Sequence, residues 1–92
     1  MKTTVASTPG EDIGRRGQEI YDLRLRAIVE TEQNIGKIIS IDVESGDFEI
    51  SDDLLLSGRR LQERHPDAKM FGKRIGYNAV YAVGGSLVRT TH

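Results

Sequence analysis

Apolar residues recur every three or four positions in the segment that follows the first dozen residues. Between Ile13 and Gln33 they form two such series, which are Ile20, Leu23 and Ala27, and Tyr21, Leu25 and Ile28. This spacing is the period of a helix with a broad buried stripe. Asn34 and Gly36 tolerate left-handed backbone angles, so we expect the helix to end near them.

The pattern then changes to one typical of strands. Residues 37–43 are rich in isoleucine and valine, and residues 47–51 alternate acidic with apolar side chains. A two-residue turn at Ser45 and Gly46 would join these strands and set their pairing. The predicted pairs are Val43 with Phe48 and Ile41 with Ile50. All four side chains would then lie on the same face of the hairpin, in the core.

A second helix is predicted after residue 53 and up to about His65. Ser51, Asp52 and Asp53 offer a capping oxygen and negative charge at its positive end. Pro66 cannot continue a helix, so it is a strong stop signal. The expected buried stripe consists of Leu54, Leu55, Gly58 and Leu61.

Two more extended stretches follow, at about 68–75 and 79–87, with a turn at residues 76–78 and two glycines, Gly84 and Gly85, that bend or end the last strand. The order α-β-β-α-β-β predicts a two-layer α+β fold, with helices packed on one face of a mainly antiparallel sheet. Residues 1–12 lack periodic apolar positions, so we expect a flexible N-terminal tail before a single domain at 13–92.

Composition narrows the class of protein. With 92 residues, 37% apolar and 29% charged, the chain fits one globular domain. No apolar run reaches the roughly 18 residues of a membrane span, and no secretory signal is recognisable, so a cytoplasmic protein is expected. The absence of cysteine excludes disulfides, thiolate metal sites and cysteine nucleophiles.

Four carboxylates alternate with the predicted core residues of the first hairpin and should therefore lie on its outer face. They are Asp42, Glu44, Asp47 and Glu49. They could bind a cation or a basic partner, or they could form a solvated face with counter-charges from Lys69, Lys73 or Arg74. A calcium loop does not fit, because the glycine stands at the fifth position, counted with Asp42 as the first, and not at the sixth.

Catalytic motifs are missing. Histidine occurs only at His65 and His92, which leaves little for a histidine base or a multi-histidine metal site. A triad of Ser57, His65 and Asp67 lacks the G-x-S-x-G pattern, and no phosphate-binding glycine motif is present. We therefore expect no catalytic residue, no metal ligand and no cofactor, and a protein that is not an enzyme.

Charge is segregated along the chain although the net charge is only −1. Residues 42–53 hold six acids and no base, whereas residues 59–74 hold six bases and two acids. The basic part could bind nucleic acid, could join two copies head to tail, or could be neutralised within one molecule. Candidate partner-binding residues are Tyr77, Tyr81, Arg59, Arg60, Arg64, Lys73 and Arg74, because aromatic and arginine side chains are enriched at interface hot spots.

Three segments resemble a known family. They are I-D-V-E-S-G-D-F-E-I at 41–50, H-P-D-A at 65–68, and R-I-G-Y-N-A-V-Y at 74–81 with Gly84-Gly85. Together, over roughly residues 17–85, they resemble short, uncharacterised bacterial proteins, common in cyanobacteria, with an I-D-x-E-S/T-G-D-Y/F hairpin and an R-I-G-Y-x-A-x-Y segment. Members are often encoded beside a small retropepsin-like protein. The resemblance implies a two-gene module of antitoxin or adaptor type, and it implies no catalytic residues.

These features are compatible with two functions. The first is a non-catalytic protein-interaction module, antitoxin-like or adaptor, whose partner is a protein such as the retropepsin-like neighbour and which forms a homodimer. The alternative is a small nucleic-acid-binding regulator with a local basic patch at Arg59, Arg60, Arg64, Lys73 and Arg74. The near-zero net charge and the acidic stretch 42–53 favour the protein partner.

Overall fold

A four-stranded antiparallel sheet forms the centre of the molecule. The computed structural model describes residues 9–78 and 80–84. The helical elements are α1 (Pro9–Ile20), the π-helical turn η1 (Tyr21–Leu25), α2 (Arg26–Val29) and α3 (Leu54–Arg64). The strands are β1 (Ile38–Asp42), β2 (Phe48–Ser51), β3 (Met70–Arg74) and β4 (Val80–Gly84), in the spatial order β2-β1-β3-β4. The predicted α+β fold, with an antiparallel sheet covered by helices, is confirmed.

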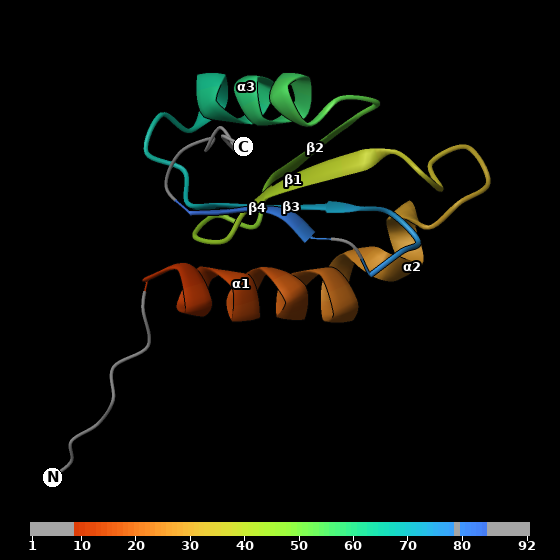
Figure 1. Ribbon diagram of the computed structural model, residues 1–92, viewed down its shortest axis with the longest axis horizontal. Coiled ribbons are helices and arrows are strands. Elements are labelled where there is room, and N and C mark those ends of the chain that lie inside the picture. Colours follow the sequence, from red (N-terminus) through yellow and green to blue (C-terminus); the bar gives the residue numbers. More distant parts are fainter. Residues whose placement is uncertain (1–8, 79, 85–92) are drawn as a thin grey trace, which may run out of the picture.

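The helices are divided between the two faces of the sheet, whereas the sequence led us to expect them on one face. The run from α1 to α2 lies on one side and α3 lies on the other (Figure 1). Ile39 and Ile41 pack on the α1 side. Between them in sequence, the Ser40 hydroxyl lies 2.8 Å from the Ser57 hydroxyl of α3. Successive strand residues point to opposite faces, so this division explains why every residue of β1 is buried.

The first helical run presents every fourth residue to the sheet. The buried positions are Ile13, Gly17, Tyr21, Leu25 and Val29. In a straight α-helix, residues four apart drift by about 40° around the axis. The wider π turn η1 rotates less per residue and offsets part of this drift. Leu23 and Ile28 consequently point away from the sheet, with 79% and 64% exposure, so their predicted place in the buried stripe is wrong.

The start of this run and its end can also be compared with the sequence. α1 begins at Pro9, within the segment 1–12 that was assigned to a flexible tail. The fixed φ angle of proline suits the first turn of a helix. The rest of that tail lies outside the described residues. The run ends at Val29, so the predicted helix end near Asn34 and Gly36 is wrong. Gly36 does adopt a left-handed φ of 92°, but in the turn that precedes β1.

The first hairpin pairs Ile41 with Phe48 and Ile39 with Ile50, so the predicted two-residue turn is wrong. The connection is longer and is closed by hydrogen bonds from Gly46 N to Asp42 O, at 2.7 Å, and from Asp42 N to Asp47 O, at 2.8 Å. A shift of two positions leaves each side chain on its original face. The predicted core face is therefore confirmed, with Ile41 buried and Phe48 packed against the same cluster.

α3 begins and ends where local signals predict. The Asp53 carboxylate accepts a hydrogen bond from Leu55 N at 3.0 Å, and the helix stops at Arg64, just before His65 and Pro66. Gly58 and Leu61 are buried as predicted, but Leu55 is 54% exposed. Leu61 packs with Ala68 and Met70, in a cluster separate from that on the α1 side. Among the residues that the structure describes, no helix is long and apolar enough to span a membrane.

Candidate functional site

A network of charged side chains joins the first hairpin to the end of α3. Arg64 donates hydrogen bonds from Nε and Nη2 to Asp47 Oδ2, at 3.0 and 2.8 Å. Its Nη1 forms an ion pair with Glu49, and its Nη2 also reaches the carbonyl of Phe48, at 3.2 Å. One guanidinium thus holds two carboxylates and a backbone oxygen of the edge strand β2.

His65 continues this network toward the interior. Its Nε2 lies 2.9 Å from Asp47 Oδ2, and its Nδ1 lies 3.8 Å from Asp42 Oδ2. Asp42 is only 3% exposed. It accepts hydrogen bonds from the Ser45 hydroxyl, at 2.8 Å, and from the backbone amides of Glu44 and Lys69, each at 3.2 Å. Every oxygen of this buried carboxylate therefore has a partner.

These contacts keep both aspartates ionised. Burial alone would raise the pKa of Asp42, but the hydrogen bonds from Ser45, Glu44 and Lys69, together with nearby His65, outweigh burial and lower that pKa. Hydrogen bonds from Arg64 and then His65 lower the pKa of Asp47 to about 2. The predicted outer, solvated acidic face is therefore wrong for Asp42, because α3 ends over that side of the hairpin. The counter-charges come from Arg64 and His65.

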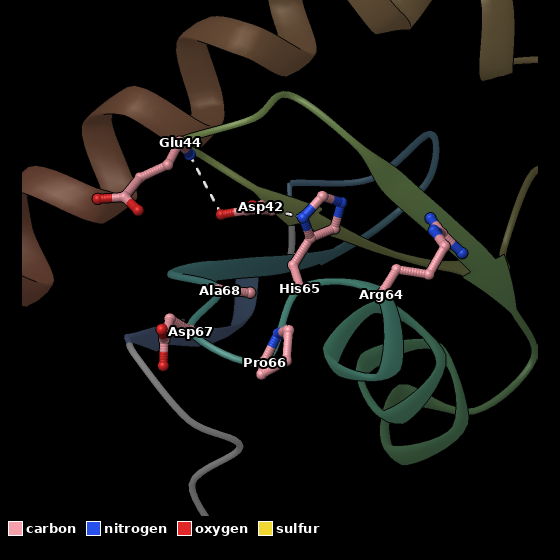
Figure 2. A pocket seen from close by; sticks show the side chains of 7 residues that line it. All are labelled: Asp42, Glu44, Arg64, His65, Pro66, Asp67 and Ala68. Atoms are coloured by element: carbon pink, nitrogen blue, oxygen red, sulfur yellow. Dashed lines mark hydrogen bonds and ion pairs between the residues drawn. The ribbon is translucent and has the colours of Figure 1, made fainter.

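A pocket of about 250 Å³ opens beside this network. Its lining consists of Asp42, Glu44, Arg64, His65, Pro66, Asp67 and Ala68. In Figure 2, the carboxylates of Glu44 and Asp67 lie on one side of His65, and the Arg64 guanidinium lies on the other side. The pocket is thus bordered by acids, while the strongest base of its lining is already bound to Asp47 and Glu49.

The polar groups around the pocket do not form a triad of Ser57, His65 and Asp67, because Ser57 is not part of the lining. Both ring nitrogens of His65 face carboxylates, so neither nitrogen is directed at a nucleophile. Ser57, the serine of the triad that the sequence analysis rejected, is bonded to Ser40 inside the fold. Within residues 9–78 and 80–84, no group of His, Asp and Glu side chains is arranged to hold a metal ion.

The seven predicted partner-binding residues do not form one patch. Arg59 and Arg60 are exposed on α3, and Arg64 belongs to the network described above. Lys73 is 2% exposed and lies on the opposite, α1 side of the sheet. Tyr81 belongs to β4, but its side chain lies outside the described part of the structure.

Lys73 is a buried cation. Its Nζ lies 4.0 Å from the centroid of the Tyr21 ring, at the start of η1, in a cation–π contact. Burial, and then nearby Arg26, lower the pKa of Lys73. The Tyr21 hydroxyl donates to Glu30 at 2.6 Å, and burial together with that hydrogen bond raises the pKa of Tyr21 to about 12. The sequence did not single out Tyr21, because one tyrosine in an apolar stripe carries no signal of such a contact.

Tyr77 stands beside a second exposed apolar residue that the sequence analysis missed. Tyr77 is 54% exposed and Ile35 is 45% exposed. A Cβ atom added to Gly76 would lie 2.7 Å from Ile35 Cδ1, so the isoleucine side chain rests directly on the turn that carries Tyr77. A pair of backbone hydrogen bonds holds the two segments together, from Gly36 N to Ile75 O at 3.0 Å and from Ile75 N to Lys37 O at 2.8 Å.

Arg74 completes this end of the sheet. Its guanidinium donates to the Gly36 carbonyl at 2.9 Å and lies 5.8 Å from the centroid of the Tyr77 ring. We refer to Ile35, Arg74 and Tyr77 as the sheet-end patch. An isoleucine between Asn34 and Gly36 in a turn-forming segment was the available sequence signal, since an apolar residue there has no strand or helix face to occupy.

Comparisons with known proteins do not assign this chain to a family. No family model matches it, and neither the curated proteins nor the solved structures contain a match. The function is therefore inferred from the arrangement of its own residues.

Proposed function

We propose that this protein is a non-catalytic interaction module that binds a protein partner through the sheet-end patch. The observation that carries the proposal is the juxtaposition of Tyr77 and Ile35, two exposed apolar side chains from distant segments, next to the guanidinium of Arg74. Tyrosine and arginine are enriched among the residues that dominate binding energy at protein interfaces.

The patch is held in place before any partner binds. Gly76 adopts a φ of 86°, a conformation that suits glycine, and a larger residue there would displace Ile35. Arg74 is anchored to the carbonyl of Gly36. Side chains that are already positioned lose less conformational entropy on binding, so more of the contact energy is retained as affinity.

The distribution of basic residues favours a protein partner over nucleic acid. Phosphate binding needs several cations on one accessible surface. Lys73 is buried against the Tyr21 ring, and Arg64 is paired with Asp47 and Glu49, so neither side chain is available to bind a phosphate. Arg59 and Arg60 are exposed on α3, but the acids Asp52 and Asp53 directly precede that helix. A nucleic-acid-binding regulator remains the alternative, and the experiment below distinguishes it.

The family resemblance adds a candidate for the partner. Under this proposal the protein acts in the cytoplasm as an antitoxin-like protein or adaptor, and a small retropepsin-like protein is the first partner to test. Because the resemblance implies no catalytic residues, the proposal assigns no reaction to the chain.

Tyr77→Ala tests the proposal. The tagged protein would first be incubated with host extract, in parallel with and without nuclease treatment. Any protein that it retains, and the retropepsin-like candidate, would then be purified for binding measurements. Calorimetric titration would measure Kd for the wild type and the variant. Because truncation of a hot-spot residue costs about 2 kcal/mol or more, Tyr77→Ala should raise Kd by about 30-fold or more.

Leu23→Ala is the matched control, since Leu23 is a large apolar residue with 79% exposure on η1 and lies outside the sheet-end patch. Its Kd should equal that of the wild type. Equal binding by Tyr77→Ala and the wild type would contradict the proposed surface. Retention of nucleic acid alone, with affinity that falls steeply with salt, would favour the alternative function.

A further inference from the structure

The outer face of α3 carries acids, leucines and arginines in that order along the chain. The acids precede the helix, the leucines lie in its first turn and the arginines follow one turn later. All of these side chains are exposed, with Leu55 at 54% and Leu56 at 40%. We call this set the α3 outer face; its members are Asp52, Asp53, Leu55, Leu56, Arg59 and Arg60.

This face points away from the rest of the molecule. The buried positions of α3 are Ser57, Gly58 and Leu61, which alternate with the exposed ones at helical spacing. In Figure 1, α3 is an outer layer with the sheet on one side of it. Two leucines on such a surface, with charges on either side, are arranged as in an interface, with an apolar centre and a polar rim.

Apart from Asp53, the charged side chains of this face have no partner among residues 9–78 and 80–84. In the described part of the chain, Asp52, Arg59 and Arg60 form no ion pair and no side-chain hydrogen bond. Asp53 uses one carboxylate oxygen to cap α3. The two arginines are therefore available for acids that come from outside the molecule.

The order of the charges makes the face complementary to itself. Arg59 stands three residues after Leu56, and Asp53 stands three residues before it, which is about 4.5 Å along a helix in each direction. When two α3 helices lie antiparallel about a two-fold axis at the leucines, Arg59 and Arg60 of one copy lie opposite Asp52 and Asp53 of the other. The two leucine pairs then meet at the axis, as an isologous contact requires.

We infer that the α3 outer face is the contact surface between two copies of this chain, which pair through antiparallel α3 helices. A second copy provides acids for the arginines and arginines for the acids, and it also covers the leucines. Nucleic acid would satisfy the arginines only, because Asp52 and Asp53 repel a phosphate backbone. This surface lies on α3, apart from the residues of the sheet-end patch, so the inference does not depend on the proposed partner.

A charge-swap experiment tests the inference. One variant carries Asp52→Arg and the other carries Arg60→Asp, while the helix cap Asp53 and the Arg59 that faces it remain in both. Alone, each variant opposes like charges across the axis, so its dimer should dissociate about tenfold or more readily than the wild-type dimer. In an equimolar mixture, both charge contacts are opposite in sign again, and a mixed dimer should form.

Sedimentation equilibrium over a range of protein concentrations gives the dissociation constants, and thermal unfolding monitored by circular dichroism verifies that both variants are folded. The Tyr77→Ala variant should dimerise like the wild type, which separates this test from that of partner binding. A monomeric wild type up to about millimolar concentration would overturn the inference. So would a dimer that is insensitive to both variants, or a mixture that remains monomeric.

Discussion

At the scale of single residues, the end of α3 determines which acidic side chains are paired with a base. Arg64 and His65 both bind Asp47, and His65 also faces the buried Asp42. The sequence predicted that the second helix ends at about His65, and α3 does end at Arg64. It did not show which acids Arg64 and His65 bind, because that choice depends on where the end of α3 lies over the hairpin. Contacts between residues 17 or 18 positions apart have no periodic signature in a sequence.

Because folding lowers the pKa of Asp47, the stability of the protein should depend on pH. The folded-state pKa of about 2 lies below the ordinary value of 3.8, so the stabilisation is complete above about pH 4 and is lost as pH falls through 2. Asp47→Asn should therefore be less stable than the wild type at pH 7 and should lose less stability between pH 4 and pH 2. Its side chain is 37% exposed, so solvent screening limits the expected difference to about 1 kcal/mol.

Urea unfolding at a series of pH values measures this difference. Asp67→Asn is the control, since that exposed carboxylate has no ion pair within the described residues. Its unfolding free energy should follow the wild-type curve. If Asp47→Asn and the wild type lose stability in parallel below pH 4, the pairing with Arg64 and His65 does not stabilise the fold.

At the scale of elements, local signals predict well and long-range packing does not. α3 was predicted to within two residues because its start and stop depend on neighbours, Asp53 and Pro66. The first helical run was predicted to exist, but its buried face was assigned with a uniform α-helical period. The π turn η1 changes that period. At its first residue, the Tyr21 ring contacts Lys73 from a distant strand.

Gly17 shows how closely α1 approaches the sheet, and it supplies a prediction. A Cβ atom at this position would lie 2.2 Å from the Cγ atom of Phe71. Helix propensity alone would make Gly17→Ala more stable by about 1 kcal/mol. Overpacking against a buried ring usually costs about 1–3 kcal/mol, so we expect a net loss of stability. Chemical denaturation of the wild type and the variant measures the sign directly.

Ala27→Gly is the reference for this comparison, because Ala27 is exposed on α2 and reports helix propensity without a packing change. Ala27→Gly should lower the free energy of unfolding by about 1 kcal/mol. The two opposite substitutions should therefore both destabilise the protein. A more stable Gly17→Ala would show that α1 can move away from β3 at little cost.

At the scale of the whole molecule, the sheet separates two apolar clusters. The cluster on the α1 side includes Phe71 and Ile41, and the one on the α3 side includes Leu61 and Met70. Helices on one face of the sheet, as the sequence led us to expect, would place Leu61 in one core with the hairpin residues, but Leu61 packs in the other cluster. The reason is that β1 is covered on both faces, a property visible only as the nearly unbroken apolar run Ile38–Ile41. Nothing in the sequence indicated the order of the strands in the sheet.

The central strands should therefore contribute more to stability than the edge. Phe71 is 1% exposed and lies on β3, between β1 and β4. Phe48 lies on the edge strand β2 and is only partly buried. Phe71→Ala should cost about 3–5 kcal/mol, as for a fully buried ring, and Phe48→Ala should cost about half as much. Because small domains are stable by only about 5–15 kcal/mol, the first variant will be close to unfolding.

Urea unfolding at 25 °C measures the free energy of unfolding of both alanine variants. If Phe71→Ala is already unfolded in buffer, Phe71→Leu is used as a milder substitution. Phe71→Leu is then compared with Phe48→Leu. In each pair the loss should be larger at residue 71, because its ring is only 1% exposed and packs against Gly17 of α1, whereas the ring at 48 is partly exposed on the edge strand. Equal losses at the two positions would mean that β2 packs as tightly as the centre of the sheet, and the assignment of Phe48 to a partly open edge would be wrong.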